Sequence, residues 1–168
     1  MALMVETFGA KATGVDLAPE AIAFCRKTHA DARFEVGDAE HLPFEDGTFD
    51  VVTNIESSHT YPNLRAFFAE VSRVLTQGGL FLYTALLPQQ RWMEVTVLLP
   101  PLGLRIVSER DITRNVLASC DSVAEVRAQA FGEKNAAIDN FLAVPGSAVY
   151  TQMSSGAWSY RLLRAERI

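Results

Sequence analysis

Residues 33–63 read RFEVGDAEHLPFEDGTFDVVTNIESSHTYPN, and this stretch decides the fold. It predicts two short apolar strands, at 33–36 and at 49–53. The first strand is followed by Gly37-Asp38-Ala39-Glu40 and the second by Asn54. Ligands of an open parallel sheet bind outside the carboxyl ends of its strands. Both polar clusters are therefore expected at the same edge of one sheet.

Helices are predicted between the strands. The clearest spans residues 63–75, because its apolar residues recur at spacings of three and four, Asn63 can cap its start and Gly78-Gly79 follows its end. The remaining elements expected in the first half are a helix at 1–9, a strand at 11–17, a helix at 19–29 and a strand at 80–84. This alternation predicts an α/β fold with a Rossmann-like, mostly parallel sheet and helices on both faces.

The second half is expected to add a helical lid and a closing strand. A short helix is predicted at 89–99 and a strand at 104–108, followed by short helices at 112–118, 122–131 and 135–142. The last strand is predicted at 158–166, at the edge of the sheet. We therefore expect one domain, with a cofactor-binding core at 1–87, an acceptor and lid region at 88–146 and a closing strand at 147–168.

Composition excludes several classes of function. The formal net charge is −5 and no run of Lys or Arg is present, which argues against a nucleic-acid surface. The most apolar run, 95–104, contains Pro100 and Pro101 and is far shorter than the roughly 20 residues that span a bilayer. No secretory leader is recognisable, so a cytoplasmic location is expected. Cys25 and Cys120 lack metal-ligand spacing, which indicates reduced thiols and no metal site.

Two aspartates are candidate nucleoside ligands. Asp16 ends a predicted strand, where a carboxylate can accept hydrogen bonds from both ribose hydroxyls. Asp38 follows the next strand and can accept from an adenine amine. Each also has a structural alternative, because Asp16 could cap a turn before Pro19 and Asp38 could belong to a polar turn. Their occurrence at two strand ends favours a bound nucleoside.

His59 is the candidate general base, because a histidine titrates near neutral pH. Glu56, three residues earlier, could orient its imidazole. The alternative is a loop histidine that caps a helix or bonds to the backbone.

Four segments together resemble successive motifs of class I S-adenosylmethionine-dependent methyltransferases: Gly14-Val15-Asp16 and residues 37–44, 49–52 and 73–79. Residues 54–62, 109–113 and 159–161 are similar to a narrower group. That group contains the phthiotriol/phenolphthiotriol dimycocerosate O-methyltransferases and related polyketide or glycolipid O-methyltransferases.

The resemblance implies that S-adenosylmethionine is the cofactor. Asp16 would hold the ribose, with Leu17 in the same cofactor-binding set, and Asp38 and the Ala39 amide would contact adenine. Asn54 would lie near the methionine part, and His59 would face the acceptor oxygen. The implied reaction is methyl transfer to a hydroxyl of a small-molecule, lipid or polyketide acceptor, by in-line displacement at the sulfonium methyl. Homodimerisation is left open.

The family's first strand and glycine-rich loop are absent from this sequence. That strand would lie between the strands ending at Asp16 and Thr53, so we expect two unpaired strand edges, exposed apolar surface and weak cofactor binding. A truncated product, a misassigned start and a non-catalytic remnant remain open explanations. The alternative function is a binding or scaffold protein that retains the fold without the chemistry. A nicotinamide dehydrogenase would need GxGxxG after the first strand, which is not found.

Overall fold

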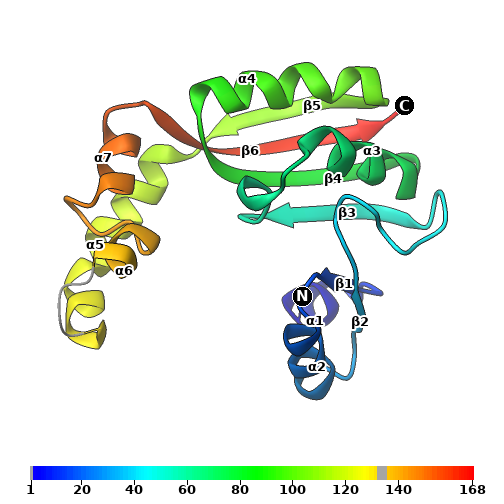
Figure 1. Cartoon of the computed structure of the whole chain (residues 1–168), viewed down its shortest axis with the longest axis horizontal. Coiled ribbons are helices and arrows are strands. Elements are labelled where there is room, and N and C mark those ends of the chain that lie inside the picture. Colours follow the sequence, from blue (N-terminus) through cyan, green and yellow to red (C-terminus); the bar gives the residue numbers. More distant parts are fainter. Residues whose placement is uncertain (1, 132–135) are drawn as a thin grey trace.

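Two separate β-sheets form the framework of the computed structural model, which describes residues 2–131 and 136–168 (Figure 1). The smaller sheet pairs β1 (Thr13–Asp16) with β2 (Arg33–Val36) in parallel. The larger sheet has the strand order β3-β4-β6-β5. In it β3 and β4 are parallel, whereas β6 is antiparallel to both of its neighbours. Its strands are β3 (Phe49–Ile55), β4 (Leu75–Pro88), β5 (Leu104–Asp111) and β6 (Trp158–Arg167).

Helices lie beside both sheets, and the predicted α/β, Rossmann-like class is confirmed. Near the smaller sheet are α1 (Ala2–Phe8) and α2 (Pro19–Thr28). Beside the larger sheet are the short 3₁₀ helices η1 (Ser58–Thr60) and η2 (Pro100–Leu102), with α3 (Leu64–Val74) and α4 (Gln89–Leu98). Between β5 and β6 the chain forms α5 (Thr113–Phe131), α6 (Ala136–Phe141) and α7 (Ala148–Ser154), which project from one end of the sheet (Figure 1).

The main core lies between α3, α4 and one face of the larger sheet. The side chain of Asn63 caps α3 by accepting a hydrogen bond from the Ala66 amide at 3.1 Å, as predicted. The apolar stripe of the helix is buried, and its Phe67 and Phe68 contact Phe81 of β4 with ring centroids 6.0 and 6.1 Å apart. Aromatic packing of this kind contributes about 0.5–1.5 kcal/mol per pair beyond area burial. This packing fixes the position of α3 on β4.

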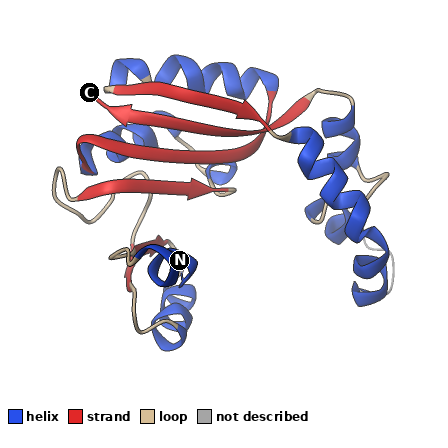
Figure 2. Cartoon of the chain, turned by 180° about the vertical axis from the view of Figure 1, so that it is seen from behind, coloured by secondary structure: helices blue, strands red, loops and turns tan. Residues whose placement is uncertain are grey.

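The opposite face of the larger sheet is open. Figure 2 shows it with the strands in front and the helices behind them. Val51 and Ile55 of β3 are 47% and 61% exposed there, and Leu82 and Leu162 lie on the same face. Among the strands of the described residues, β3 pairs only with β4 and β1 pairs only with β2. The predicted unpaired edges and exposed apolar surface are therefore confirmed.

The second half of the chain differs from the prediction in three places. The last strand was expected at the edge of the sheet, which is wrong, because β6 lies between β4 and β5 and hydrogen-bonds to both. The helices expected at 112–118 and 122–131 form one continuous helix, α5, since the intervening residues contain no helix breaker. α7 was not predicted, although Ser147 caps it by accepting from the Tyr150 amide. Residue 135, at the start of the third predicted helix, lies outside the described residues.

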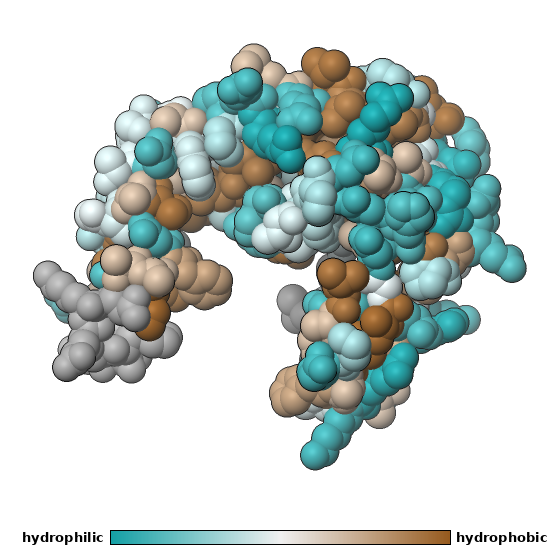
Figure 3. Space-filling model, in the orientation of Figure 1, coloured by the Kyte–Doolittle hydropathy of each residue, from teal (hydrophilic) through white to brown (hydrophobic). Residues whose placement is uncertain are grey.

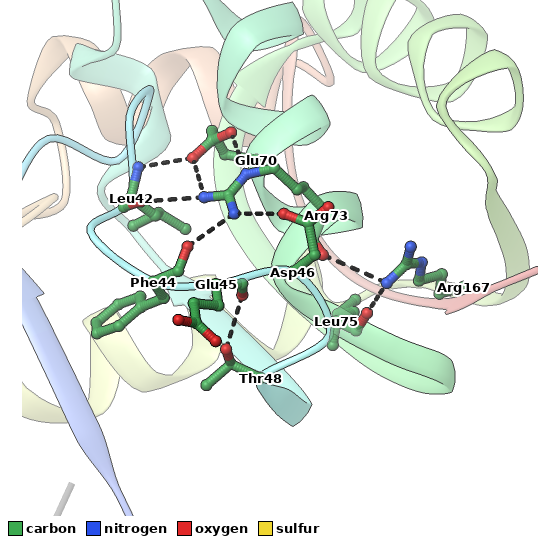
Figure 4. A network of polar contacts seen from close by, with 9 residues as sticks. All are labelled: Leu42, Phe44, Glu45, Asp46, Thr48, Glu70, Arg73, Leu75 and Arg167. Atoms are coloured by element: carbon green, nitrogen blue, oxygen red, sulfur yellow. Dashed lines mark hydrogen bonds and ion pairs between the residues drawn. The ribbon is translucent and has the colours of Figure 1, made fainter.

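Arg73 fastens the loop between β2 and β3 to α3 (Figure 4). Its guanidinium donates to the carbonyls of Leu42 and Phe44 at 3.0 and 2.7 Å and pairs with Asp46 at 2.8 Å. Glu70, one turn earlier, pairs with Arg73 at 2.7 Å and accepts from the Leu42 amide at 2.7 Å. The hydrogen bond from Arg73 lowers the pKa of Glu70 below its ordinary value. Side chains of α3 therefore hold the loop that contains Asp38 in place.

Replacing Arg73 with alanine should lower the free energy of unfolding by about 2 kcal/mol, because several charge-assisted hydrogen bonds and their backbone partners are lost together. Arg105→Ala is the matched control, since Arg105 makes one exposed ion pair, with Glu166 at 2.8 Å, and should change stability by less than about 1 kcal/mol. Urea unfolding followed by circular dichroism measures both. Equal effects of the two substitutions would contradict the role given to Arg73.

Candidate functional site

Asp16 and Asp38 lie at the carboxyl ends of two paired parallel strands. Asp16 is the last residue of β1 and pairs with Val36, and Asp38 follows two residues after Val36. One carboxylate oxygen of each accepts a backbone amide two residues later, from Ala18 and from Glu40, each at 2.8 Å. The structural alternative weighed for both residues is therefore present. The second oxygen of each carboxylate has no hydrogen bond within the described part of the chain and remains free for a ligand.

The loops after β2 and β3 are held side by side. Glu40 accepts a hydrogen bond from the Asn63 amide at 2.7 Å, which links the turn containing Asp38 to the first residue before α3. Because α3 follows the loop that leaves β3, this bond keeps the two polar clusters on one side of the larger sheet. This geometry supports a shared edge, and the cofactor contacts assigned to Asp16, Leu17, Asp38 and Ala39 remain predictions.

Asn54 is buried near the end of β3 and has one unused hydrogen-bonding atom. Its amide nitrogen donates to Ser57 Oγ at 2.9 Å and to the Tyr61 hydroxyl at 3.0 Å. Its Oδ1 is buried with no partner. An unsatisfied buried acceptor costs about 1–3 kcal/mol. An incoming N–H donor, such as the amino group of a methionine moiety, would satisfy it, so Asn54 fits the cofactor role predicted for it.

His59 is exposed in η1, and its imidazole makes no hydrogen bond with any described residue. Glu56 was expected to orient it. Instead, Glu56 Oε1 accepts the Leu86 amide at 2.6 Å, so the structure does not contain the expected pair. The backbone at Glu56 has a left-handed φ of 55° and turns the chain there.

A cavity of about 870 Å³ opens beside His59. Its sheet side carries the polar side chains of Glu56, His59, Arg91 and Tyr160. Its lid side is formed by α5, α6, α7 and the turn between α6 and α7, and is mostly apolar. The lid-side residues are Val116, Cys120, Asn140, Phe141, Leu142, Ala143, Val149 and Met153, and Leu86, Leu87, Pro88 and Trp158 complete the wall. Apolar pockets of this size with few polar groups are typical of small-molecule sites.

Two tyrosines near this cavity stay protonated at neutral pH. Burial, with the nearby Glu56 carboxylate, raises the pKa of Tyr160 to about 12. Burial also raises the pKa of Tyr83 to about 12, and its hydroxyl shares a 2.6 Å hydrogen bond with Ser58 Oγ. Sequence reasoning assigned no role to Tyr160 or Arg91. The only signal for Tyr160 was its place in the segment 159–161.

A family model described as a methyltransferase domain matches residues 1–83. The chain is 36% identical over 157 residues to the phthiotriol/phenolphthiotriol dimycocerosates methyltransferase of Mycobacterium tuberculosis, covering 89% of this chain and 58% of that protein. Together these matches support a class I S-adenosylmethionine-dependent methyltransferase. The resemblance found in the sequence is therefore confirmed, and the cofactor of this family is S-adenosylmethionine.

The chain is also similar to a second curated relative and to a solved structure. It is 45% identical over 107 residues to the fatty-acid O-methyltransferase of Mycolicibacterium smegmatis, covering 62% of this chain and 39% of that one. Its fold matches geranyl diphosphate methyltransferase in complex with SAM, with a TM-score of 0.74 and 23% identity, over 100% of this chain and 73% of that one. The chain spans about half the length of the curated relatives it matches.

Two kinds of feature are absent from residues 2–131 and 136–168. No helix there has the length and apolar character needed to cross a bilayer. No group of three or more His, Cys, Asp or Glu side chains there could hold a metal ion.

Tyrosine ionisation tests the polar side of the cavity. With folded pKa values of about 12, against an ordinary value of about 10, Tyr83 and Tyr160 stabilise the fold below pH 10 and lose that contribution between pH 10 and 12. The absorbance at 295 nm, which follows tyrosine ionisation, should contain a component with its midpoint near pH 12. Tyr160→Phe should reduce the amplitude of that component. Glu56→Gln should move it to lower pH by removing a negative charge. An unchanged titration in Glu56→Gln would show that the carboxylate does not act on Tyr160.

Proposed function

We propose that this domain transfers a methyl group from S-adenosylmethionine to a hydroxyl of a lipid-like or polyketide acceptor. The observation that carries the proposal is the cavity beside His59, with polar groups on its sheet side and apolar side chains on its lid side. The names of the curated relatives support the choice of acceptor class. S-adenosylmethionine, when bound, supplies an electrophilic methyl group on a sulfonium.

The donor side of the site would be formed by the strand ends. Asp16 would hold the ribose, with Leu17 in the same cofactor-binding set, and Asp38 with the Ala39 amide would bind adenine through the carboxylate oxygen and N–H group available there. Asn54 Oδ1, buried without a partner, would accept from the amino group of the methionine part. The protein's main contribution is alignment, because transfer from a sulfonium to a neutral oxygen needs little charge stabilisation.

The acceptor side would be formed by the cavity. His59 lies on its wall with its imidazole free of other hydrogen bonds among the described residues, so a ring nitrogen can accept the proton of an acceptor hydroxyl. The apolar lid side would bury the hydrocarbon part of the acceptor and exclude water. A cytoplasmic location, homodimerisation and the three-part domain division remain predictions.

A second candidate function is a binding or scaffold role without catalysis. The observation in its favour is that β1 and β3 lie in different sheets, so the two halves of the proposed donor site are not joined by strand pairing. The acceptor cavity does not depend on that pairing. A protein of this kind would bind the acceptor and leave it unmodified.

Transfer of a radioactive methyl group from S-adenosylmethionine to a long-chain alcohol tests the reaction. His59→Ala should lower kcat by about 10²–10⁴-fold, the usual contribution of a general base. His29→Ala is the control, because His29 follows α2 far from the cavity lining and should leave turnover unchanged. Near-normal turnover by His59→Ala at neutral pH would remove His59 from the mechanism.

Calorimetric titration with S-adenosylmethionine tests the donor site. We expect binding weaker than micromolar, because the strand ends that carry Asp16 and Asn54 belong to separate sheets. Asp38→Ala should weaken it by a further ~10-fold, the usual effect of losing one charge-assisted hydrogen bond. Asp31→Ala, outside the predicted contact set, should have no effect. Micromolar affinity of this chain would contradict the expectation, and equal losses in both variants would remove Asp38 from the site.

A further inference from the structure

Glu56 is held in an unusual backbone conformation at the cavity wall. Its φ of 55° lies in the left-handed region, which is strained for a non-glycine residue. Two hydrogen bonds hold it there: its amide donates to the Thr84 carbonyl at 3.0 Å, and its Oε1 accepts from the Leu86 amide at 2.6 Å. Strain that neighbouring contacts maintain is typical of ligand sites. The carboxylate is therefore fixed in place at the cavity.

Apart from His59, no described side chain on the sheet side of the cavity supplies an uncompensated positive charge near Glu56. Arg91, the only arginine among the described lining residues, pairs with Glu94 at 2.7 Å, so a carboxylate already compensates its charge. Tyr160, beside Glu56, is neutral at pH 8 and adds a hydroxyl without adding charge. When His59 is neutral, the Glu56 carboxylate is the one uncompensated charge of this lining set.

This arrangement distinguishes between two kinds of head group. An acceptor alcohol carries no charge, so it can lie beside Glu56 with its O–H directed at His59, and Tyr160 adds only a neutral hydroxyl. A fatty-acid carboxylate has no proton to donate at neutral pH and would place a second negative charge beside Glu56. Two like charges held side by side in a binding site repel each other and weaken binding. The lid side, by contrast, would contact the hydrocarbon chain equally in both ligands.

We propose that Glu56 is a specificity-determining residue, which makes this cavity bind long-chain hydroxyl compounds and reject the corresponding free fatty acids. The inference deepens the proposed function and rests on it for the meaning of the cavity. The acceptor expected for this chain, an alcohol, therefore differs from the fatty acid named for its relative, the fatty-acid O-methyltransferase.

Ligand binding tests the proposal without any methyl transfer. Trp158 lies in the cavity wall, so its fluorescence can report binding, whereas Trp92 is fully buried in the main core. Titrations of the whole chain with 1-decanol and with decanoate at pH 8 give the two dissociation constants. We expect the alcohol to bind at least ~10-fold more tightly than the acid, the discrimination that like-charge repulsion supplies.

Two substitutions should reduce the preference of the cavity for 1-decanol over decanoate. Glu56→Gln keeps the acceptor oxygen for the Leu86 amide and removes the charge, so the ratio should fall toward one. Glu94→Gln leaves Arg91 uncompensated and should tighten decanoate binding without changing binding of the alcohol. Glu45→Gln is the control, because Glu45 is an exposed residue of the β2–β3 loop and not part of the described lining, and it should keep the wild-type ratio. Circular dichroism establishes that each variant is folded.

Each outcome has a definite meaning. Equal or tighter binding of decanoate by the wild-type chain overturns the inference but leaves the proposed function standing, with a carboxylate acceptor. A preference for the alcohol that Glu56→Gln does not alter also overturns it. Binding of neither ligand overturns both the inference and the proposed acceptor cavity. A Glu56-dependent preference for the alcohol in a chain that transfers no methyl group supports the inference and contradicts the proposed function.

Discussion

The docking of α3 on β4 is the interaction on which the rest of the structure depends. The buried side of this helix packs Phe67 and Phe68 against the aromatic residues of β4. Its other contacts reach back along the chain, where Glu70 and Arg73 bind the loop between β2 and β3. One helix therefore fixes both the main core and the turn that carries Asp38. If α3 were displaced, the polar clusters after β2 and β3 would separate.

Much of the first half of the fold was predictable because its signals are local. The apolar stripe and cap of α3 and the short apolar runs of β2 and β3 each depend on residues close in sequence. The unpaired edges of β1 and β3 also followed, from a family resemblance. The position of β6 did not follow, since the choice between an edge and an interior place depends on pairing with residues fifty or more positions away. The continuity of α5 was missed because its mixed polarity hides the helical period.

The candidate site was predictable at its strand ends and less so in its cavity. Asp16 and Asp38 were predicted because a parallel sheet places strand ends together, and Asn54 was predicted from the family resemblance. His59 was predicted by residue type. The partners of Glu56 could not be read from the sequence, because Leu86 and Tyr160 approach it only through sheet pairing across β4 and β6. Arg91 enters the cavity from α4, whose weak amphipathic pattern gives no sign of a ligand.

The smaller sheet has a consequence for how the protein unfolds. Ile22 and Phe34 are the buried apolar side chains of this part, and neither belongs to the main core cluster around α3. Cooperative units of a protein open with free energies set by the contacts that each unit shares with the remainder. The β1–α2–β2 segment lies in a lobe that projects from the rest of the molecule (Figure 3), so we expect it to open as a separate cooperative unit, with amide protons that exchange with solvent long before those of β4 and β6. Any ligand bridging both sheets would couple the two openings and raise the protection of the weaker one.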